Sequence, residues 1–373
     1  MTAKGPKIAV ILGTRPEIVK LSALIRRLEK SHADYFILHT GQHYSYNMDE
    51  QFFKDLELPD PRRGPHYIFT RPSSFGANMH SELVAWMTDG IRKVLEKERP
   101  GAILVQGDTD TVLAGARAAA QIGGITIGHV EAGLRSYDMN MPEERNRLEA
   151  DRLSHVLFAP TQAAKENLLK EKLDEGRRIE VTGNTIVDAL FENIAIAEKK
   201  AAGAFKKGYA LVTLHRPETV DNKQRMLSIF QAIESIMKNR ALKRVVFPAH
   251  PRTVQRLKAH GMEGLAGKGF EIVEPMGFLD FIWHEKNADL VLTDSGGVQE
   301  ESCIFKVPCV TLRTTTERPE TVSVGANIVA GYEPEDIIRA AAEMAAKPRD
   351  WANPFGDGRS SERILRVLEG PLQ

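Results

Sequence analysis

The feature that most constrains the fold is an alternation, along the whole chain, of short apolar runs with segments of helical periodicity. The runs are rich in Val, Ile and Leu and have the length of buried strands. In the first half they are KIAVILG, YFILHTG, GAILVQGD, ITIGHVEAG, HVLFAPT and RIEVTGN. Strands that alternate with helices are typical of parallel, doubly wound sheets, so we predict an α/β fold.

The alternation starts again at Tyr209, with YALVTLH, KRVVFPAH, FEIVEP, ADLVLTDS, PCVTLR and NIVAG. At 373 residues the chain is too long for one ordinary hydrophobic core. The polar helical stretch 193–208 is the best candidate for a linker. We therefore predict two Rossmann-like domains of similar size that face a cleft. The stretch 58–74, rich in Pro and Arg, is expected to be a mobile surface loop.

The balance of charge argues against two broad classes of partner. Lys and Arg together number 50, and Asp and Glu together number 50, which gives no support for nucleic acid or a membrane surface as the main partner. The two cysteines, Cys303 and Cys309, have no metal-ligand or redox spacing, which favours a reducing compartment. The N-terminal apolar run is too short for a signal peptide, and no stretch approaches the about 18 apolar residues of a membrane span. We predict a cytoplasmic protein.

Residues able to carry chemistry gather where the predicted strands end. In open α/β sheets ligands bind beyond the carboxyl ends of the strands, so these residues are expected to share one region of each sheet. They are Arg15, Gly41–His43, Asp108, Glu131, His215–Arg216, His250, Asp294–Gly297 and Arg313.

Two cations occur near the start of one predicted helix. The stretch GTRPEIVK, residues 13–20, follows the first strand, and Thr14 with Glu17 forms a capping-box pattern. A helix N-terminus carries about half a positive charge, so Arg15 and Lys20 are unfavourable there unless an anion binds. Backbone N–H groups and two cations would make a phosphate site, whereas the alternative is two solvated cations. No Walker loop or GxGxxG motif supports an ATP-type or dinucleotide site.

A second strand-to-helix junction, DLVLTDSGGVQEESC, has the character of a nucleotide site. Ser295 can cap the helix, and Gly296 and Gly297 would let a phosphate approach the backbone. Glu301, one turn later, could accept hydrogen bonds from ribose hydroxyls. The alternative for Glu300 and Glu301 is a favourable interaction with the helix dipole.

Three acids are candidates for proton transfer. Asp108 and Glu131 follow buried strands, where a carboxylate is costly unless it is paired or functional, and Glu143 lies nearby in PEERNR. The alternatives are helix capping for Asp108, an ion pair with Arg135 for Glu131, and an ion pair with Arg147 for Glu143.

His215 ends a predicted strand and is either a structural or a catalytic residue. No HxxxH motif or cluster of His and Cys indicates a metal, and no GxSxG motif indicates acyl chemistry. By spacing alone Phe281 is a core aromatic.

Taken together, the motifs resemble those of the non-hydrolysing UDP-N-acetylglucosamine 2-epimerases, from about Lys7 to Asn327. The motifs are GTRPEIVK, TGQH, GDTDT, HVEAGLRS, PEERNR, FAPT, VTGNTIVDAL, TDSGGVQEE and TTERPE. The resemblance implies a GT-B fold. Its first domain would span residues 1–185, with a final helix at about 357–373 packing back on it, and its UDP-binding second domain would span 186–356.

The resemblance also implies the activity. Such enzymes interconvert UDP-N-acetylglucosamine and UDP-N-acetylmannosamine by anti elimination of UDP to 2-acetamidoglucal, followed by re-addition. It implies a UDP-sugar substrate, no cofactor and no metal, and a homodimer. Alternatives left open are an epimerase of a modified UDP-diacetamido sugar, a hydrolysing relative, a GT-B glycosyltransferase and a non-catalytic nucleotide-sugar binding protein.

Site residues carry over by matching position in the motifs. The acid–base candidates are Asp108, Glu131 and Glu143, with the base at C2 unassigned. Binding residues for the diphosphate, sugar, ribose and uracil are Arg15, Lys20, Arg147, His215, Ser295, Gly296, Gly297, Glu301, Arg318 and Phe281. The chain departs from the family pattern after Arg216, where Pro217–Thr219 replaces the common Arg-Glu-Asn.

Overall fold

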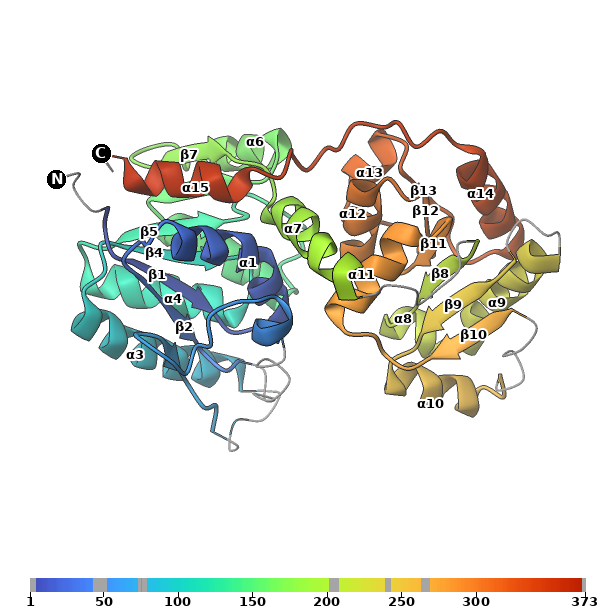
Figure 1. The fold of residues 1–373 in the computed structure, drawn as a ribbon, viewed down its shortest axis with the longest axis horizontal. Helices are drawn as coiled ribbons and strands as arrows, with labels where there is room; N and C mark the ends of the chain where they lie inside the picture. The colour runs from blue at the N-terminus through green and yellow to red at the C-terminus, as the bar shows by residue number, and fades with distance from the viewer. Residues whose placement is uncertain are drawn as a thin grey trace. The chain divides into compact units, whose positions relative to one another are not determined.

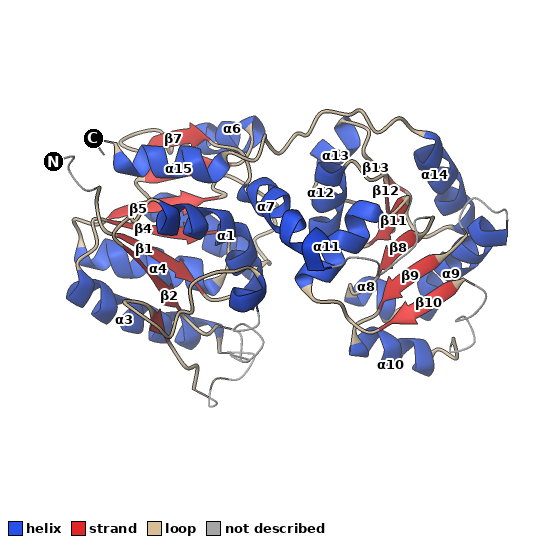
Figure 2. Ribbon diagram, viewed as in Figure 1, coloured by secondary structure: helices blue, strands red, loops and turns tan. Residues whose placement is uncertain are grey.

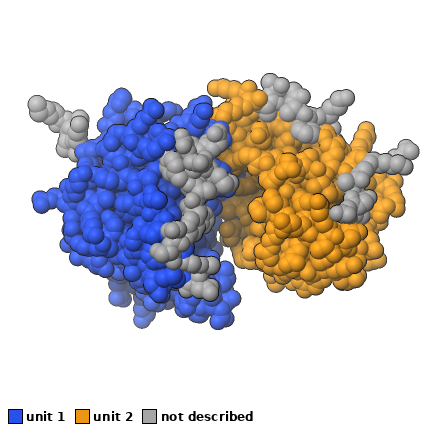
Figure 3. Space-filling view, turned by 90° about the horizontal axis from the view of Figure 1, so that it is seen from below, with its two compact units in different colours: residues 1–192, 355–373 blue, residues 193–354 orange. Residues whose placement is uncertain are grey.

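The computed structural model describes residues 5–42, 52–72, 75, 79–200, 208–238, 243–262 and 269–370. The chain divides into two compact units, coloured separately in Figure 3. Unit 1 comprises residues 1–192 and 355–373, and unit 2 comprises residues 193–354. The first stretch of unit 1 ends at Glu192, within helix α7 (Thr185–Lys200). The boundary at residue 185 that the resemblance implies falls at the start of the same helix.

Within its described residues, unit 1 is built on a seven-stranded parallel sheet in the order β3-β2-β1-β4-β5-β6-β7 (Figure 2). Strands β1 and β4 are entirely buried, as expected where helices cover both faces. The strands are β1 (Ile8–Leu12), β2 (Tyr35–His39), β3 (Tyr67–Ile68), β4 (Ala102–Gln106), β5 (Thr126–Val130), β6 (Val156–Ala159) and β7 (Arg178–Val181).

Helices cover both faces of this sheet (Figure 1). Alternate strand residues such as Ala9 and Ile11 pack into one core with α3 and α4, while α1 packs with α15 on the other face. The helices that accompany α7 in unit 1 are α1 (Arg15–Lys30), α3 (His80–Glu98), α4 (Asp110–Ile122), α5 (Pro142–Leu153), α6 (Gln162–Lys170) and α15 (Ser360–Glu369).

Unit 2 repeats the architecture with a six-stranded parallel sheet in its described residues, in the order β10-β9-β8-β11-β12-β13. One core lies under α9 and α14, and a second lies under α11 and α12. The strands are β8 (Ala210–Thr213), β9 (Val245–Pro248), β10 (Phe270–Val273), β11 (Leu290–Thr293), β12 (Cys309–Thr311) and β13 (Asn327–Val329). The helices are α8 (Pro217–Val220), α9 (Lys223–Lys238), α10 (Pro251–Ala259), α11 (Phe278–Asn287), α12 (Gly296–Phe305), α13 (Pro319–Ser323) and α14 (Pro334–Ala346).

Each sheet reverses its strand order once, between β1 and β4 in unit 1 and between β8 and β11 in unit 2. The connections on either side of such a point leave in opposite directions and open a crevice at the carboxyl ends of the strands. The predicted doubly wound α/β class is confirmed, and every predicted strand is present.

The stretch 58–74 differs from its prediction as a loop. It contains the edge strand β3, whose Tyr67 and Ile68 pair with Leu38 and His39. Two residues are too few to give a strand pattern in the sequence. Some residues named in the sequence analysis lie outside the described part of the chain. They are His43, residues 73 and 74 of this stretch, residues 201–207 of the expected linker and residues 371–373 of the final segment.

Candidate active site

Glu17 connects the loop that follows β1 with the loop that follows β4, at the switch point of unit 1. Its Oε2 accepts hydrogen bonds from the backbone N–H of Gly13 at 2.6 Å and of Thr14 at 2.8 Å. Its Oε1 accepts a hydrogen bond from the Thr109 hydroxyl, in the loop that follows β4. Burial raises the pKa of Glu17 to about 7, against the lowering effect of these hydrogen bonds.

The same contacts alter the phosphate site expected at the start of α1. Two of the N–H groups that an anion could use, those of Gly13 and Thr14, are already occupied by the Glu17 carboxylate. Arg15 begins the helix with its guanidinium carbon 5.4 Å from the centre of the Phe52 ring. What α1 offers an anion here is therefore chiefly the Arg15 side chain.

Lys20 is placed beside one of the candidate acids. Its Nζ lies 2.5 Å from Oε2 of Glu131, and Nε2 of Gln106 donates to the same oxygen at 2.8 Å. Glu131 is buried at the end of β5 and has a φ of 71°, a left-handed conformation that costs about 1 kcal/mol or more outside glycine. Strain of this kind persists where the surrounding structure imposes it, often at functional sites.

The ion pair considered for Glu131 with Arg135 is wrong. Arg135 instead places NH2 2.7 Å from Asp151 and Nε 2.7 Å from Glu171. The Asp151 carboxylate also contacts Nδ1 of His129 at 2.7 Å. Sequence reasoning missed this buried network because its members come from separate elements. His129 and Arg135 lie in the motif HVEAGLRS, but nothing in the sequence pairs them with Asp151 or Glu171.

The His129 network supports the loop that carries Asp108. Its Nε2 lies 2.7 Å from the carbonyl oxygen of Gly107, and Asp151 Oδ2 accepts the N–H of Gly133 at 3.2 Å. The side chains of His129 and Asp151 have no exposed surface. The network therefore holds the turns after β4 and β5 in fixed positions.

Asp108 and Arg147 form an ion pair, and Arg147 also pairs with Glu144. The expected pair between Glu143 and Arg147 is wrong. The first turn of α5 directs Glu144 inward to the N–H groups of Ser136 and Tyr137 and leaves Glu143 exposed.

The capping role considered for Asp108 is also wrong. Thr109, the next residue, is the N-cap of α4 and accepts the N–H of Val112. Asp108 is thus left to its ion pair with Arg147.

In unit 2 the buried Asp294, directly after β11, contacts the loop that follows the neighbouring strand β8. Its carboxylate accepts the N–H groups of His215 at 3.1 Å and Arg216 at 3.0 Å, and its Oδ1 lies 3.1 Å from Nδ1 of His215. The sequence placed Asp294 among the strand-end residues without a role. The structure makes it the group that orients His215, whose side chain is about half exposed at 51%.

The first turn of α12 is open to a ligand. Ser295 is its N-cap, and its hydroxyl accepts the N–H of Val298 at 3.5 Å. A Cβ built on Gly297 would meet nothing closer than 3.9 Å, and one on Gly296 nothing closer than 3.5 Å. A helix leaves its first N–H groups without intrahelical partners, so this turn can receive an anion. Glu301 follows one turn later and is half-buried.

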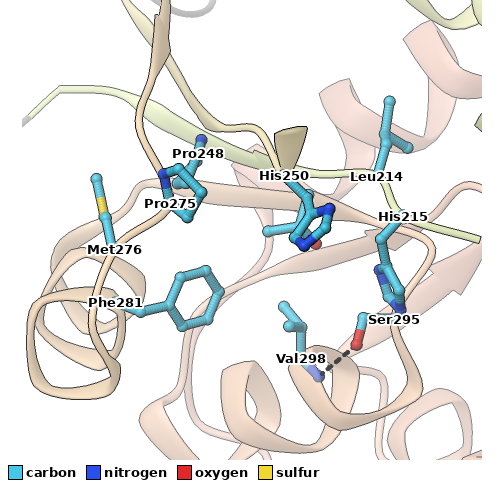
Figure 4. A pocket seen from close by; sticks show the side chains of 10 residues that line it. Leu214, His215, Pro248, His250, Pro275, Met276, Phe281, Ser295 and Val298 are labelled. Atoms are coloured by element: carbon cyan, nitrogen blue, oxygen red, sulfur yellow. Dashed lines mark hydrogen bonds between the residues drawn. The ribbon is translucent and has the colours of Figure 1, made fainter. Parts of the chain in front are cut away.

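A cavity of about 240 Å³ lies beside this turn. Figure 4 shows the Phe281 ring directed into it, with Pro275 and Met276 to one side and His215 and Ser295 across it. An apolar cavity with a few polar groups is typical of a small-molecule site. Phe281 thus lines the cavity, although by spacing it resembled a core residue.

Arg318 occupies the N-cap position of α13 without a side-chain capping hydrogen bond. Its Nε lies 3.2 Å from Oε2 of Glu300, on α12. Its NH1 also donates to the carbonyl of Glu317 at 3.0 Å. The Glu317 carboxylate is held by both terminal nitrogens of Arg313 at 2.8 Å, and these hydrogen bonds lower its pKa to about 2. Sequence reasoning had not paired Arg313 with Glu317.

The structure therefore brings the predicted residues together within each unit. Lys20 is joined to Glu131 and Asp108 to Arg147 at the carboxyl edge of the first sheet, whereas Glu143 lies exposed. His215, Ser295 and Phe281 line one cavity of unit 2. In the part of the chain that the structure describes, no group of three or more His, Cys, Asp or Glu side chains could hold a metal ion. The described helices include none long and apolar enough to cross a membrane.

Two doubly wound units with sites at their switch points define a protein of the GT-B-like class. The family model described as UDP-N-acetylglucosamine 2-epimerase matches residues 26–369. The UDP-N-acetylglucosamine 2-epimerases of Methanocaldococcus jannaschii and Methanococcus maripaludis are 51% and 47% identical to this chain. They match over 97% and 98% of it and 98% of each relative.

A solved structure of the M. jannaschii enzyme in complex with UDP-GlcNAc and UDP has a TM-score of 0.81 and 50% identity. The match covers 97% of this chain and 99% of that one. The chain belongs to the UDP-N-acetylglucosamine 2-epimerase family and is an enzyme of the isomerase class. The family resemblance seen in its motifs is confirmed.

Proposed function

We propose that this chain interconverts UDP-N-acetylglucosamine and UDP-N-acetylmannosamine without net hydrolysis. Membership of the family supports the substrate and the reaction. The observation that carries the chemistry is Glu131, a buried and backbone-strained carboxylate held by Lys20 and Gln106. An ion pair of this kind keeps the carboxylate charged, which is the form that accepts a proton.

The C2 hydrogen of the sugar is not next to a carbonyl, so simple deprotonation and reprotonation of C2 would be very costly. In the proposed route the removal of this proton is therefore coupled to the loss of UDP. A base removes this hydrogen as a proton, its bonding pair forms the C1–C2 double bond, and the C1–oxygen bond breaks with its electrons leaving on UDP. The product is 2-acetamidoglucal. UDP oxygen then adds back to C1 while a proton is delivered to C2 on the opposite face, which inverts the configuration.

Unit 1 supplies the acid–base groups in this proposal. Asp108, Glu131 and Glu143 are the candidates, and the base at C2 is left unassigned. Asp108 and Glu131 are each paired with a cation, so a positive charge accompanies each acid. Arg15, Lys20 and Arg147 would stabilise the negative charge that develops on the departing diphosphate.

Unit 2 supplies the nucleotide site in this proposal. Phe281 would contact uracil in the apolar cavity, the N-terminal turn of α12 would bind phosphate, and Glu301 would accept hydrogen bonds from the ribose. Arg318, at the N-cap of α13, would contribute charge near the leaving group. His215, oriented by Asp294, would contact the diphosphate or the sugar.

The test is incubation with UDP-N-acetylglucosamine in deuterated water, followed by proton NMR. We expect UDP-N-acetylmannosamine to form, with deuterium at C2 of product and of recovered substrate. Free sugar accumulating with UDP would contradict a non-hydrolysing reaction. Binding of UDP-N-acetylglucosamine without deuterium exchange at C2 would favour a non-catalytic binding protein. Turnover of a UDP-diacetamido sugar alone would make that sugar the substrate.

The proposal includes a homodimer and a cytoplasmic location. Both cysteines are buried as free thiols, which is compatible with a reducing compartment. Light scattering during size exclusion should give about twice the 41.5 kDa chain mass, and a monomer mass would contradict the dimer.

A further inference from the structure

His129, in β5, is a buried histidine to which the proposed reaction gives no role. Its side chain and that of Asp151 have no exposed surface. Nδ1 of the ring lies 2.7 Å from Oδ1 of Asp151, and Nε2 lies 2.7 Å from the carbonyl oxygen of Gly107. Each ring nitrogen therefore faces an oxygen atom.

These two contacts determine how many protons the ring holds. A carbonyl oxygen can only accept a hydrogen bond, so Nε2 carries a proton. The second oxygen of Asp151 is already surrounded by donors, since it accepts the N–H of Gly133 at 3.2 Å and lies 2.7 Å from NH2 of Arg135. The contact between Nδ1 and Oδ1 needs one further proton, on either the ring or the carboxyl.

The ring is the stronger base of this pair. An ordinary imidazole binds a proton about 400-fold more tightly than an ordinary aspartate carboxylate. Although burial opposes ionisation, the charges of His129 and Arg135 lower the pKa of Asp151 below its ordinary value. The proton therefore resides on Nδ1, and with a proton on each nitrogen the ring is an imidazolium.

The charges of the cluster balance in this state. Arg135 also holds Glu171, with Nε 2.7 Å from Oε1 and NH2 2.9 Å from Oε2. His129 and Arg135 then supply two positive charges, against the two negative charges of Asp151 and Glu171. A neutral ring beside an ionised Asp151 would leave an uncompensated negative charge in an enclosed site, which is costly.

The imidazolium acts on the backbone at Asp108. It holds the carbonyl of Gly107, and Nδ2 of Asn146 donates to the carbonyl of Asp108 itself at 3.1 Å. These carbonyls belong to the two peptide groups on either side of the Asp108 Cα. Because each peptide group is planar, holding both of them fixes φ and ψ of Asp108, and with them the direction of its side chain.

We propose that His129 is a permanent imidazolium that holds the Gly107 carbonyl and thereby positions the Asp108 carboxylate for proton transfer. A charged donor suits this task, because its hydrogen bond is about twice as strong as that of a neutral donor. His129 is thus a positioning residue that acts through Asp108. The role for Asp108 rests on the proposed function, whereas the charge of the ring does not.

Nitrogen NMR of protein labelled with ¹⁵N-histidine measures the charge of the ring without substrate. Both ring nitrogens of His129, assigned by their loss in His129→Gln, should have the chemical shift of protonated nitrogens from about pH 6 to about pH 8. His155 is the matched control, because its Nδ1 accepts the N–H of Ile127 at 3.0 Å and should be unprotonated at about pH 8. Absence of any doubly protonated ring from the wild type at that pH would overturn the inference.

Kinetics test whether the ring acts through Asp108. His129→Gln should lower kcat by about 10- to 100-fold and change KM by less than about threefold, because a displaced acid–base group slows the reaction more than it weakens binding. His155→Gln should keep the wild-type kcat.

A double variant separates positioning from a general structural effect. Asp108→Asn should itself lower kcat, and adding His129→Gln should change kcat little further, since the carboxylate that the ring positions is already absent. Losses that multiply in the double variant would overturn the positioning role. Failure of the wild type to epimerise would remove the proposed function and this role together, and the NMR result would still decide the charge of the ring.

Asp151→Asn keeps the positioning role testable if His129→Gln does not fold. This substitution has the same size and withdraws the carboxylate that stabilises the imidazolium. Its loss of kcat should likewise disappear in the Asp108→Asn background, and a loss that persists there would contradict the inference.

Discussion

Lys20 shows how a charged residue can suggest one partner in the sequence and have another in the fold. Near the start of a helix it suggests a bound anion, yet its Nζ lies 2.5 Å from the Glu131 carboxylate. With side-chain exposures of 17% and 9%, the pair is largely removed from water, where breaking it is more costly than at the surface. In the proposed reaction Lys20 stabilises two negative charges, that of the Glu131 carboxylate and that of the departing diphosphate.

Lys20→Met should lower kcat by about 100-fold or more, because Glu131 loses the cation that keeps it charged and in position. KM should change less. Steady-state kinetics check this, with Lys30→Met, an exposed residue of the same helix, as the matched control. A variant with wild-type kcat would show that the ion pair has no part in the reaction.

Glu17→Gln should change how stability depends on pH. Burial raises the folded-state pKa from 4.5 to about 7, so between these values the folded protein binds a proton that the unfolded chain releases. The wild type should therefore lose about 3 kcal/mol relative to the variant as pH rises from 4.5 to about 7. Urea unfolding of both proteins across this range measures the difference, and a constant difference would contradict the prediction.

At the scale of elements, α1 and α12, each of which follows a strand at a switch point, differ in the backbone N–H groups that their N-termini offer to an anion. At the start of α1, the N–H groups of Gly13 and Thr14, just before the helix, are bound by the side chain of Glu17. The first turn of α12 has two glycines with room around them and a cap, Ser295, that satisfies one N–H group. The second helix is therefore the better phosphate site, although both sequences begin with a capping residue.

Gly297→Ala should weaken UDP binding by about tenfold or more without destabilising the protein. Alanine favours the helix, and its methyl group would meet no protein atom closer than 3.9 Å, so it should obstruct only the ligand. Calorimetry with UDP and thermal unfolding measure the two effects. Gly370→Ala, at the end of α15, is the control, and unchanged UDP affinity in Gly297→Ala would remove this turn from the binding site.

At the scale of the whole molecule, unit 1 is built from two stretches of chain that lie far apart in the sequence. The chain returns to it at residue 355, and the carbonyl of Phe355 accepts the N–H of Asn184 at 2.8 Å. The buried Asp188 carboxylate of α7 then accepts the N–H groups of Ser360 at 3.0 Å and Ser361 at 2.8 Å. A charged acceptor at the N-terminus of α15 attaches that helix to the unit.

Asp188→Asn should lower the free energy of unfolding of unit 1 by about 2 kcal/mol, because one charged acceptor of two N–H groups is lost from a buried site. Limited proteolysis should then release the C-terminal segment faster. Asp357→Asn removes an exposed partner of Arg363 and should change stability by less than about 0.5 kcal/mol. Equal effects of the two substitutions would contradict the role of Asp188.

Much of the fold could be predicted because buried parallel strands are apolar runs whatever their neighbours are. The strand β3 could not, since Tyr67 and Ile68 pair at an edge and form no pattern of their own. The strand ends that carry Asp108, Glu131 and Ser295 followed from the same reasoning, because a loop begins where an apolar run stops.

What the sequence alone determined is which residue types stand at the carboxyl ends of the strands; their partners were decided by the tertiary structure. Glu131 pairs with Lys20 rather than Arg135, and Arg147 with Glu144 rather than Glu143. Asp294 reaches His215 because β8 and β11 are neighbours in the sheet. The physical reason is that ion pairs and hydrogen bonds form between groups a few ångströms apart, and strand order and helix rotation set those distances once the chain has packed.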